Sequence, residues 1–260
     1  MSTLLKRQGN KSKIAKNILS YFPKHDIFIE TCLGAGGIYF NKPKAKYNIL
    51  NDLDDDVFNL FNLIKNDAEL FKTEFEKVPL NHSLFDFWVK NEEVTPLSKA
   101  LRFLYLSNFS LYGGMETFKI DCRDNMKRLT LQRINEALLY LSNAVISCKD
   151  FEVFLKNIHF NSQRDKTKTF VYNDPPYLGT GNNYKNGFKV EDTERLIKAN
   201  IAFNSKFAIS EFDNPIVIEM AKDYNLFVFD IGERRNIKNR RKEILITNYS
   251  VEQFIQPTLL

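Results

Sequence analysis

A strand that stops at two prolines is the feature that most constrains the fold of this 260-residue chain. The apolar run Thr169–Asn173 is typical of a buried strand, and Asp174-Pro175-Pro176-Tyr177 follows it at once. Neither proline has a backbone N–H to donate to a ladder, so the chain must leave the sheet at this point. In open α/β sheets, ligands bind at the carboxyl ends of the strands. The tetrapeptide is therefore predicted to lie at a binding crevice.

The residues of the tetrapeptide suit one kind of chemistry. The exocyclic amine of adenine is a poor nucleophile, because its lone pair is delocalised into the ring. The carboxylate of Asp174 and the fixed carbonyl of Pro175 could accept hydrogen bonds from both amine hydrogens, which would pull the nitrogen toward tetrahedral geometry. Tyr177 offers a stacking face for a base taken out of the helix. The alternative interpretation is a turn that ends a strand and carries an incidental aspartate.

A glycine-rich turn follows an earlier strand signal, Ile27–Ile29. The segment Glu30–Gly37 contains Gly34 and Gly36, and such a turn brings a backbone close to a cofactor. The full Gly-x-Gly-x-x-Gly fingerprint is absent, and a tight structural turn would give the same pattern. Asp52, after a second strand signal, stands where such folds bind ribose hydroxyls, although an aspartate in a surface turn is the alternative.

Two further segments carry candidate ligands. Asp150-Phe151 follows a third strand signal, Ala144–Ser147, and would suit the adenine of a nucleoside cofactor. The same pair would also suit a helix N-cap followed by a core aromatic residue. Arg7 and Lys11 precede the first helix signal and could meet a carboxylate or phosphate, or belong to a charged, solvated leader.

Basic residues gather between the last two strand signals, Leu226–Ile231 and Ile244–Thr247, which could form a hairpin. A loop this basic is a reasonable contact for DNA phosphates, and a solvated loop is the alternative. The formal net charge of +5 agrees with an anionic partner but also with ordinary solubility. The predicted DNA contacts are Arg234, Arg235, Lys238, Arg240 and Arg241.

The order of the signals predicts an α/β fold with an insertion. Strand and helix signals alternate in residues 1–53 and 144–260, as in a Rossmann-like sheet with helices on both faces. Helices are expected there at 12–21, 191–202 and 215–222. Residues 54–143 show helical spacing alone, at 57–64, 70–75, 84–89, 97–109 and 131–141. We expect a catalytic domain made of 1–53 and 144–260, and a mostly helical insertion at 54–143.

The number and spacing of the cysteines and histidines limit which disulfides and metal sites the chain can form. Cys32, Cys122 and Cys148 are far apart and include no Cys-x-x-Cys pair, which argues against a disulfide framework and against zinc. The three histidines are isolated from one another, so no metal site is expected. Without an apolar leader or a long apolar span, neither secretion nor membrane insertion is expected.

The motifs and their order resemble the Dam-type (D12 class, alpha group) DNA adenine-N6 methyltransferases. Asp174–Tyr177 is similar to the catalytic tetrapeptide of that family. Phe28–Gly37 is similar to its cofactor loop, with Glu30 in place of the commoner aspartate, and the long insertion comes between the two. Further similar segments are Arg7–Lys11 at the N-terminal motif, Asn51-Asp52 at the ribose position, Asp150-Phe151 on the adenine side and Lys242–Tyr249 in the last strand.

The resemblance implies a site-specific methyltransferase that moves a methyl group from S-adenosylmethionine to N6 of adenine in duplex DNA, by base flipping and direct transfer, without a metal. The insertion would be its target-recognition domain. The implied catalytic residues are Asp174, Pro175, Pro176 and Tyr177. The implied cofactor contacts are Arg7, Lys11, Glu30, Gly34, Gly36, Asp52, Asp150, Phe151 and Asp174.

Some positions depart from the family pattern. Asn108–Gly114 is reminiscent of the family's recognition hairpin, but residues 115–123 do not match it, so a GATC target is not implied. Ser210-Glu211 stands where Ser-Asn is usual, and its role stays open. Methyltransferases that act on RNA adenine or protein glutamine more often carry Asn-Pro-Pro-Tyr, so Asp174 favours DNA.

Besides methylation of DNA, RNA or protein, the remaining alternative is a non-catalytic DNA-binding protein that keeps the methyltransferase fold. Loss of Asp174 or of the loop glycines would have favoured this alternative, but these residues are present. By resemblance, the partner is double-stranded DNA, and a cognate restriction endonuclease is a candidate partner. The expected location is the nucleoid-associated cytoplasm of a bacterium, with a bacterial or phage gene. The recognition sequence and the oligomeric state stay open.

Overall fold

The computed structural model describes residues 4–119, 125–179, 187–235 and 240–251. These residues form two compact units. The first combines the residues up to Ser12 with Leu33–Asn41 and Asp52–Cys148. The second combines Lys13–Cys32, Lys42–Asn51 and the residues from Lys149 onward. The chain therefore passes from one unit to the other several times.

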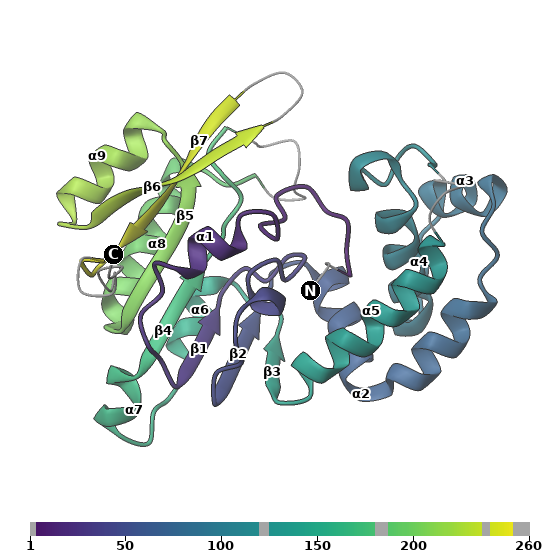
Figure 1. Ribbon diagram of the computed structural model, residues 1–260, viewed down its shortest axis with the longest axis horizontal. Coiled ribbons are helices and arrows are strands. Elements are labelled where there is room, and N and C mark those ends of the chain that lie inside the picture. The colour runs from purple at the N-terminus through teal and green to yellow at the C-terminus, as the bar shows by residue number, and fades with distance from the viewer. Residues whose placement is uncertain (1–3, 120–124, 180–186, 236–239, 252–260) are drawn as a thin grey trace, which may run out of the picture. The chain divides into compact units, whose positions relative to one another are not determined.

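The second unit contains a mixed β-sheet (Figure 1). Its strands are neighbours in the order β2-β1-β4-β5-β7-β6. The first four run parallel, whereas β7 is antiparallel to both β5 and β6. The strand signals predicted from sequence are thus confirmed, hairpin included. The bounds are β1 (Ile27–Glu30), β2 (Tyr47–Asn51), β4 (Thr169–Asn173), β5 (Lys206–Phe212), β6 (Phe227–Arg235) and β7 (Arg240–Thr247).

Helices cover both faces of this sheet, as predicted (Figure 1). On one face, apolar strand residues such as Ile29 and Val171 pack with α6 (Phe151–Lys156), α8 (Val190–Phe203) and α9 (Pro215–Asp223). On the other face, α1 (Ala15–Leu19) leads into Phe22, whose ring lies 4.5 Å from that of Phe170. Since side chains alternate along a strand, a fully buried strand needs apolar residues at every position. The short helix α7 (Gln163–Thr167) precedes β4.

Two helix predictions in this unit differ in their outcome. The predicted helix over 12–21 is too long, because α1 spans Ala15–Leu19 and Ile14 at its N-cap supplies no capping side chain. Pro215 does start α9, and the side chain of Asn214 accepts a hydrogen bond from Ile216 N–H as its cap.

The strand order reverses beside β1, which places the carboxyl ends of β1 and β4 next to each other. Glu30 is in register with Tyr172. Thr31 donates its N–H to the carbonyl of Tyr172 at 3.1 Å and its hydroxyl to Asn173 Oδ1 at 2.7 Å. Such a reversal is the place where open α/β sheets bind ligands.

The first unit is mostly helical. Its elements are α2 (Asp55–Lys77), α3 (His82–Lys90), α4 (Pro96–Asn108), α5 (Met126–Leu141), the 3₁₀ turns η1 (Tyr39–Asn41) and η2 (Leu111–Gly113), and β3 (Ala144–Ser147). Helices α4 and α5 both pack against α2. The predicted helices 57–64 and 70–75 both lie in α2, on either side of a kink at Asp67, where the backbone leaves the helical conformation (φ −137°, ψ 43°). Asp54 caps α2 by accepting a hydrogen bond from Asp56 N–H.

The two units are divided at other places than the predicted 53/54 and 143/144. The N-terminal residues up to Ser12, residues 33–41 and strand β3 cluster with the helices of the first unit. Among the residues that the structure describes, no helix is both long and apolar enough to cross a membrane.

Candidate active site

Asp174-Pro175-Pro176-Tyr177 leaves the sheet directly after β4. Asn173, the last residue of that strand, is fully buried and donates its amide to the carbonyl of Ala208 on β5 at 3.0 Å. Asp174 is half-buried, and its Oδ1 is shielded from solvent. Pro175 is buried. A carboxylate and a rigid backbone therefore stand at the crevice that the strand order predicts.

Tyr177 is held by two neighbouring strands. Its ring meets the ring of Phe212 edge-on, with centroids 4.6 Å apart, and its hydroxyl donates to Glu243 Oε2 at 3.4 Å. Burial raises the pKa of Tyr177 well above its usual value, and the negative charges of Asp174 and Glu243 add to this. The hydroxyl therefore stays protonated and able to donate.

Ser210, one of the two residues whose role the sequence left open, contacts the strand that precedes the tetrapeptide. Its hydroxyl shares a hydrogen bond of 2.7 Å with the hydroxyl of Tyr172, the residue two before Asp174. Both residues are fully buried. Ser210 thus satisfies a buried polar group in β4 that would otherwise destabilise the sheet.

Asn51, at the end of β2, ties three chain segments together. Its amide donates to the carbonyls of Thr31 at 3.0 Å and Lys149 at 2.8 Å, and its Oδ1 accepts from Lys149 N–H at 3.0 Å. The residue is 1% exposed. The segments that carry Glu30 and Asp150 are therefore linked in the second unit.

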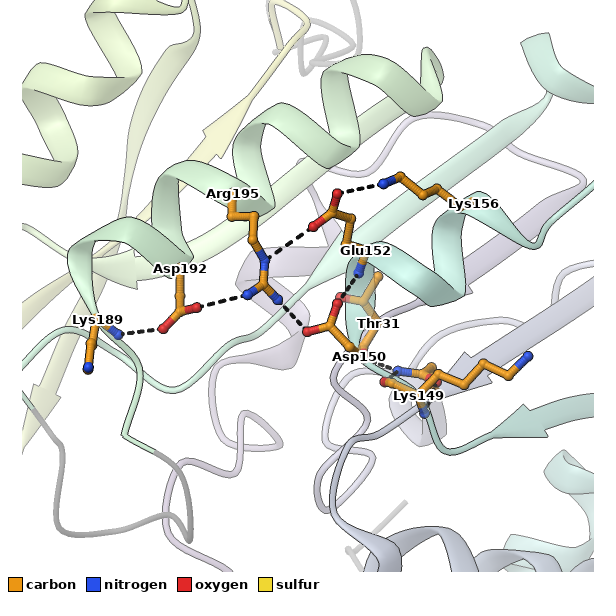
Figure 2. A network of polar contacts seen from close by, with 9 residues as sticks. Thr31, Lys149, Asp150, Glu152, Lys156, Lys189, Asp192 and Arg195 are labelled. Carbon is orange, nitrogen blue, oxygen red and sulfur yellow. Dashed lines mark hydrogen bonds and ion pairs between the residues drawn. The ribbon is translucent and has the colours of Figure 1, made fainter.

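Asp150 and Phe151 are fixed by Arg195 (Figure 2). Asp150 caps α6, because its Oδ1 accepts from Glu152 N–H at 3.0 Å, and its Oδ2 accepts from Arg195. Figure 2 shows the Arg195 guanidinium between Asp150, Glu152 and Asp192, with N···O distances of 3.3 Å to Glu152 and 3.2 Å to Asp192. The same guanidinium lies 4.5 Å from the centroid of the Phe151 ring. The helix-cap geometry is thus realised, and the predicted contact with adenine stays a prediction.

Glu30 and Lys42 are both buried, at 1% and 3% exposure. The ammonium of Lys42 lies 4.2 Å from the ring centroid of Phe28 and donates to the carbonyl of Pro43 at 2.7 Å. Burial lowers the pKa of Lys42 to about 8, although the nearby charge of Glu30 acts in the opposite direction. An ammonium in this position costs free energy of folding.

The pH dependence of stability tests this burial. Lys42 has a folded-state pKa of about 8, and an unfolded lysine titrates near about 10.4, so the unfolded state binds more protons between these values. Stability should therefore rise across this window by on the order of 3 kcal/mol, and be lost as the pH falls toward the folded pKa. Lys42→Met should remove this contribution and so reduce the rise, whereas exposed Lys44→Met should leave the rise unchanged. Urea unfolding at about pH 7 and about pH 10 measures this; an identical rise in Lys42→Met would contradict the prediction.

The glycine loop and Asp52 come together in the first unit. Asp52 accepts from Gly34 N–H at 2.5 Å through Oδ2 and from Asp54 N–H at 2.9 Å through Oδ1. Gly34 has φ +51° and Gly36 has φ +67°, and a Cβ on Gly36 would lie 2.3 Å from the Phe40 ring. Position 36 therefore requires glycine, whereas at Gly34 the left-handed backbone favours glycine. Burial raises the pKa of Asp52, and the two N–H donors and Arg7 oppose this shift.

Arg7 and Lys11 lie in the same unit as the glycine loop. Arg7 Nη2 forms an ion pair of 2.6 Å with Asp54 Oδ2, and the Lys11 ammonium, 4% exposed overall, donates to the carbonyl of Gly9 at 3.0 Å. A Cβ on Gly37 would lie 2.7 Å from Lys11 N, so the N-terminal segment packs directly on the loop. The structure thus brings Arg7, Lys11, Gly34, Gly36 and Asp52 into one unit.

A cluster of acids begins α2. Within the described residues, Asp54, Asp55 and Asp56 are close enough to hold a cation. Asp54 already pairs with Arg7 and caps the helix, and acids are favourable at a helix N-terminus because of the macrodipole. The helix start therefore accounts for these carboxylates.

The basic hairpin has the predicted pairing, with Arg234 opposite Arg241 and Arg235 opposite Arg240. Lys238 lies outside the described residues, and among the other four only the side chain of Arg241 is described. It is exposed, and its guanidinium lies 5.2 Å from the ring centroid of Phe212, the residue that packs on Tyr177. DNA contact by these residues stays a prediction.

The loop after α4 belongs largely to Asn108–Gly114, the segment reminiscent of a recognition hairpin, and its left-handed residues were not predicted from sequence. Tyr112 is 69% exposed and has φ +56°, and Met115 has φ +59°. Non-glycine residues in the left-handed region cost on the order of 1 kcal/mol or more and cluster at functional sites. At Gly113 a Cβ would lie 2.2 Å from the carbonyl oxygen of Lys6, which fixes this loop to the N-terminal segment.

Several residues around the site were missed from sequence. Glu243 and Arg195 contact predicted residues from distant strands or helices, so no local spacing marks them. In the second unit the structure holds the predicted residues Glu30, Asp150, Phe151, Asp174, Pro175, Pro176 and Tyr177.

Comparison with known proteins identifies relatives. The family model of the D12 class N6 adenine-specific DNA methyltransferases matches residues 8–230. The DNA adenine methylase of Salmonella typhi is 27% identical over 188 residues, which cover 66% of this chain and 64% of that protein. The DNA adenine methylase of Serratia marcescens is 29% identical over 215 residues, covering 74% and 75%. The modification methylase LlaI of Lactococcus lactis subsp. lactis is 26% identical over 279 residues, covering 93% and 42%.

Proposed function

The chain belongs to the D12 class of N6 adenine-specific DNA methyltransferases, and we propose that it transfers a methyl group from S-adenosylmethionine to N6 of adenine in duplex DNA. The observation that carries the proposal is the position of Asp174–Tyr177 at the carboxyl end of β4, beside the end of β1. The chain spans 64% of the length of the Salmonella typhi relative. The activity of this chain is therefore proposed from the geometry of this site and from its membership of the family.

The residues of the tetrapeptide would act on the amine and on the ring of a flipped adenine. Asp174 and the Pro175 carbonyl accept the two amine hydrogens, which localises the lone pair on nitrogen. Tyr177 stacks on the base. With S-adenosylmethionine bound, the nitrogen would form a bond to the methyl carbon as the carbon–sulfur bond breaks, the thioether would leave with the bonding electrons, and the proton lost from the amine would pass to solvent. No covalent enzyme intermediate is needed, and the chain contributes orientation and electrostatics.

The residues present fit S-adenosylmethionine, which supplies a methyl group activated by a sulfonium. Asp52 follows β2 and can accept hydrogen bonds from ribose hydroxyls, and Gly34 and Gly36 allow close approach of the backbone. We propose Asp150 and Phe151 as contacts of the adenine. Arg7, Lys11, Glu30 and Asp174 are the other proposed contacts.

Two regions are proposed as DNA contacts. The β6–β7 hairpin would meet phosphates through Arg234, Arg235, Lys238, Arg240 and Arg241. We further propose that residues 54–143 recognise the target sequence, since the exposed Tyr112 lies in a strained loop of the helical unit. An exposed aromatic side chain suits contact with bases.

Neutralising the hairpin should weaken the salt dependence of DNA binding. Replacing Arg234, Arg235, Arg240 and Arg241 with glutamine should reduce the slope of log K against log salt by up to about 4, since each phosphate contact contributes about 0.9. Binding titrations over a range of salt concentrations measure the slope. The matched control replaces four exposed lysines of the same unit, Lys16, Lys24, Lys44 and Lys46. An equal loss of slope in both variants would assign no special role to the hairpin.

We also propose a cognate restriction endonuclease as partner and the nucleoid-associated cytoplasm of a bacterium as location, with a bacterial or phage gene. The similarity to a protein named modification methylase supports the first of these.

The direct test is to express the chain in a host that lacks adenine methylation and to map methylated bases in its DNA. We expect N6-methyladenine at one short sequence, and the same result with purified protein, S-adenosylmethionine and unmethylated DNA. Absence of methylated adenine from both, or methylation of RNA or protein instead, would contradict the proposal.

A further inference from the structure

We propose that Glu211 is a positioning residue that holds the Asp174–Tyr177 tetrapeptide in the geometry needed for a flipped adenine. Glu211 stands near the end of β5, at the position whose role the sequence left open. The inference rests on the proposed function, because it concerns the same site.

Glu211 anchors the chain directly after the tetrapeptide. The residue is 1% exposed, and its Oε1 accepts hydrogen bonds from Leu178 N–H at 3.1 Å and from Phe212 N–H at 3.0 Å. At the other end of the tetrapeptide, Asn173 is anchored by its hydrogen bonds to Thr31 and Ala208. Pro175 and Pro176 lack backbone donors, so anchors at the ends largely determine the path between them.

The same carboxylate acts on the surroundings of the Tyr177 ring. Phe212, whose N–H it accepts, packs its own ring against Tyr177 and is in register with Glu243 of β7. Glu243 in turn accepts the hydroxyl of Tyr177. Glu211 therefore connects the backbone that follows Tyr177 to the strand residue that orients its ring.

The length of the side chain is the property that matters at position 211. A glutamate side chain spans the distance from β5 to Leu178, and one oxygen serves two donors. Glutamine has the same length and keeps an acceptor oxygen, whereas aspartate keeps the charge but is one methylene shorter. If positioning is the role, glutamine should substitute for glutamate and aspartate should not. If negative charge is the role, the order should be reversed.

The test compares Glu211→Gln, Glu211→Asp and Glu211→Ala, with exposed Glu219→Ala as the control. The substrate is a duplex that carries the mapped target site. The measurements are kcat, KM for DNA, affinity for S-adenosylmethionine, thermal unfolding, and the fluorescence of 2-aminopurine at the target base, which reports flipping. If the alanine variant does not fold, the comparison of Glu211→Gln with Glu211→Asp still decides between positioning and charge.

We expect Glu211→Gln to stay within about threefold of the wild-type kcat, and Glu211→Asp and Glu211→Ala to lose at least about tenfold, because small displacements of a reacting group cost this much. Donor affinity should change less than about twofold, and 2-aminopurine fluorescence should fall with kcat. A wild-type rate in Glu211→Asp with a loss in Glu211→Gln would overturn the inference. An inactive wild-type enzyme would instead refute the proposed function.

Discussion

Replacing Asp174 with alanine is expected to lower kcat for methyl transfer to DNA by about 10²- to 10³-fold, the effect of removing one preorganised hydrogen-bonding group from an active site. In the proposed mechanism Asp174 would supply one of the two acceptors for the amine hydrogens, and in the variant only the Pro175 carbonyl would remain. The side chain is half-buried at the end of β4, so the fold should tolerate the change. Initial rates with a labelled donor and the mapped target duplex measure the effect.

Two companion variants separate the role of the carboxylate from general effects. Asp174→Asn keeps an acceptor oxygen but loses the charge, and it should fall between wild type and alanine, since hydrogen bonds to charged groups are roughly twice as strong. Asp213→Asn removes the charge of an exposed acid just after β5 and should leave kcat unchanged. Were Asp174→Ala to transfer methyl groups at nearly the wild-type rate, the proposed mechanism would be wrong.

Asp52→Ala is expected to raise the Kd for S-adenosylmethionine by about 10²-fold, because a hydrogen bond to a charged group contributes about 1.5–3 kcal/mol. The substitution removes the acceptor of Gly34 N–H and Asp54 N–H, so the glycine loop loses its anchor, and the proposed contact with the ribose is lost as well. Calorimetric titration with the donor measures the affinity. At saturating donor, kcat should fall much less than the affinity does.

Asp55→Asn is the matched control, since Asp55 is an exposed acid in the first turn of α2. The pH dependence adds a second check. Burial raises the pKa of Asp52, so acid protonates this carboxylate at a higher pH than it would an ordinary aspartate. As the pH is lowered, donor binding should therefore begin to weaken at that higher pH. An unchanged Kd in Asp52→Ala would remove this residue from the proposed cofactor site.

Much of the fold could be predicted because its signals are local. An apolar run such as Phe170–Tyr172 needs no partner to be recognised as a buried strand, and the prolines that follow it fix where the strand ends. Helical spacing likewise predicted the helices of residues 54–143, since an amphipathic face repeats within a few residues. The gap between the helix signals 57–64 and 70–75 corresponds to the kink at Asp67, where the backbone of α2 is not helical.

The parts of the site that could not be predicted depend on partners far along the chain. Glu211 and Leu178 are 33 positions apart, and Tyr177 and Glu243 are 66 apart, so only the register of β5 and β7 brings them together. Asp150 illustrates the opposite case, because the cap of α6 is a local feature that sequence can suggest, whereas its ion pair with Arg195 is not.

The reversal of strand order beside β1 also determines when the crevice can form during folding. Thr31 and Asn173, which join the two strand ends, are 142 positions apart. During synthesis on a ribosome, helices α2–α5 are therefore all made after β1 and before β4, so β1 cannot pair with β4 until they are complete. Closing so long a loop costs chain entropy before the contacts between the strands form, and this makes parallel pairing slow. The helical unit can consolidate early, and the junction of β1 and β4, where the proposed catalytic residues lie, is among the last parts of the protein to assemble.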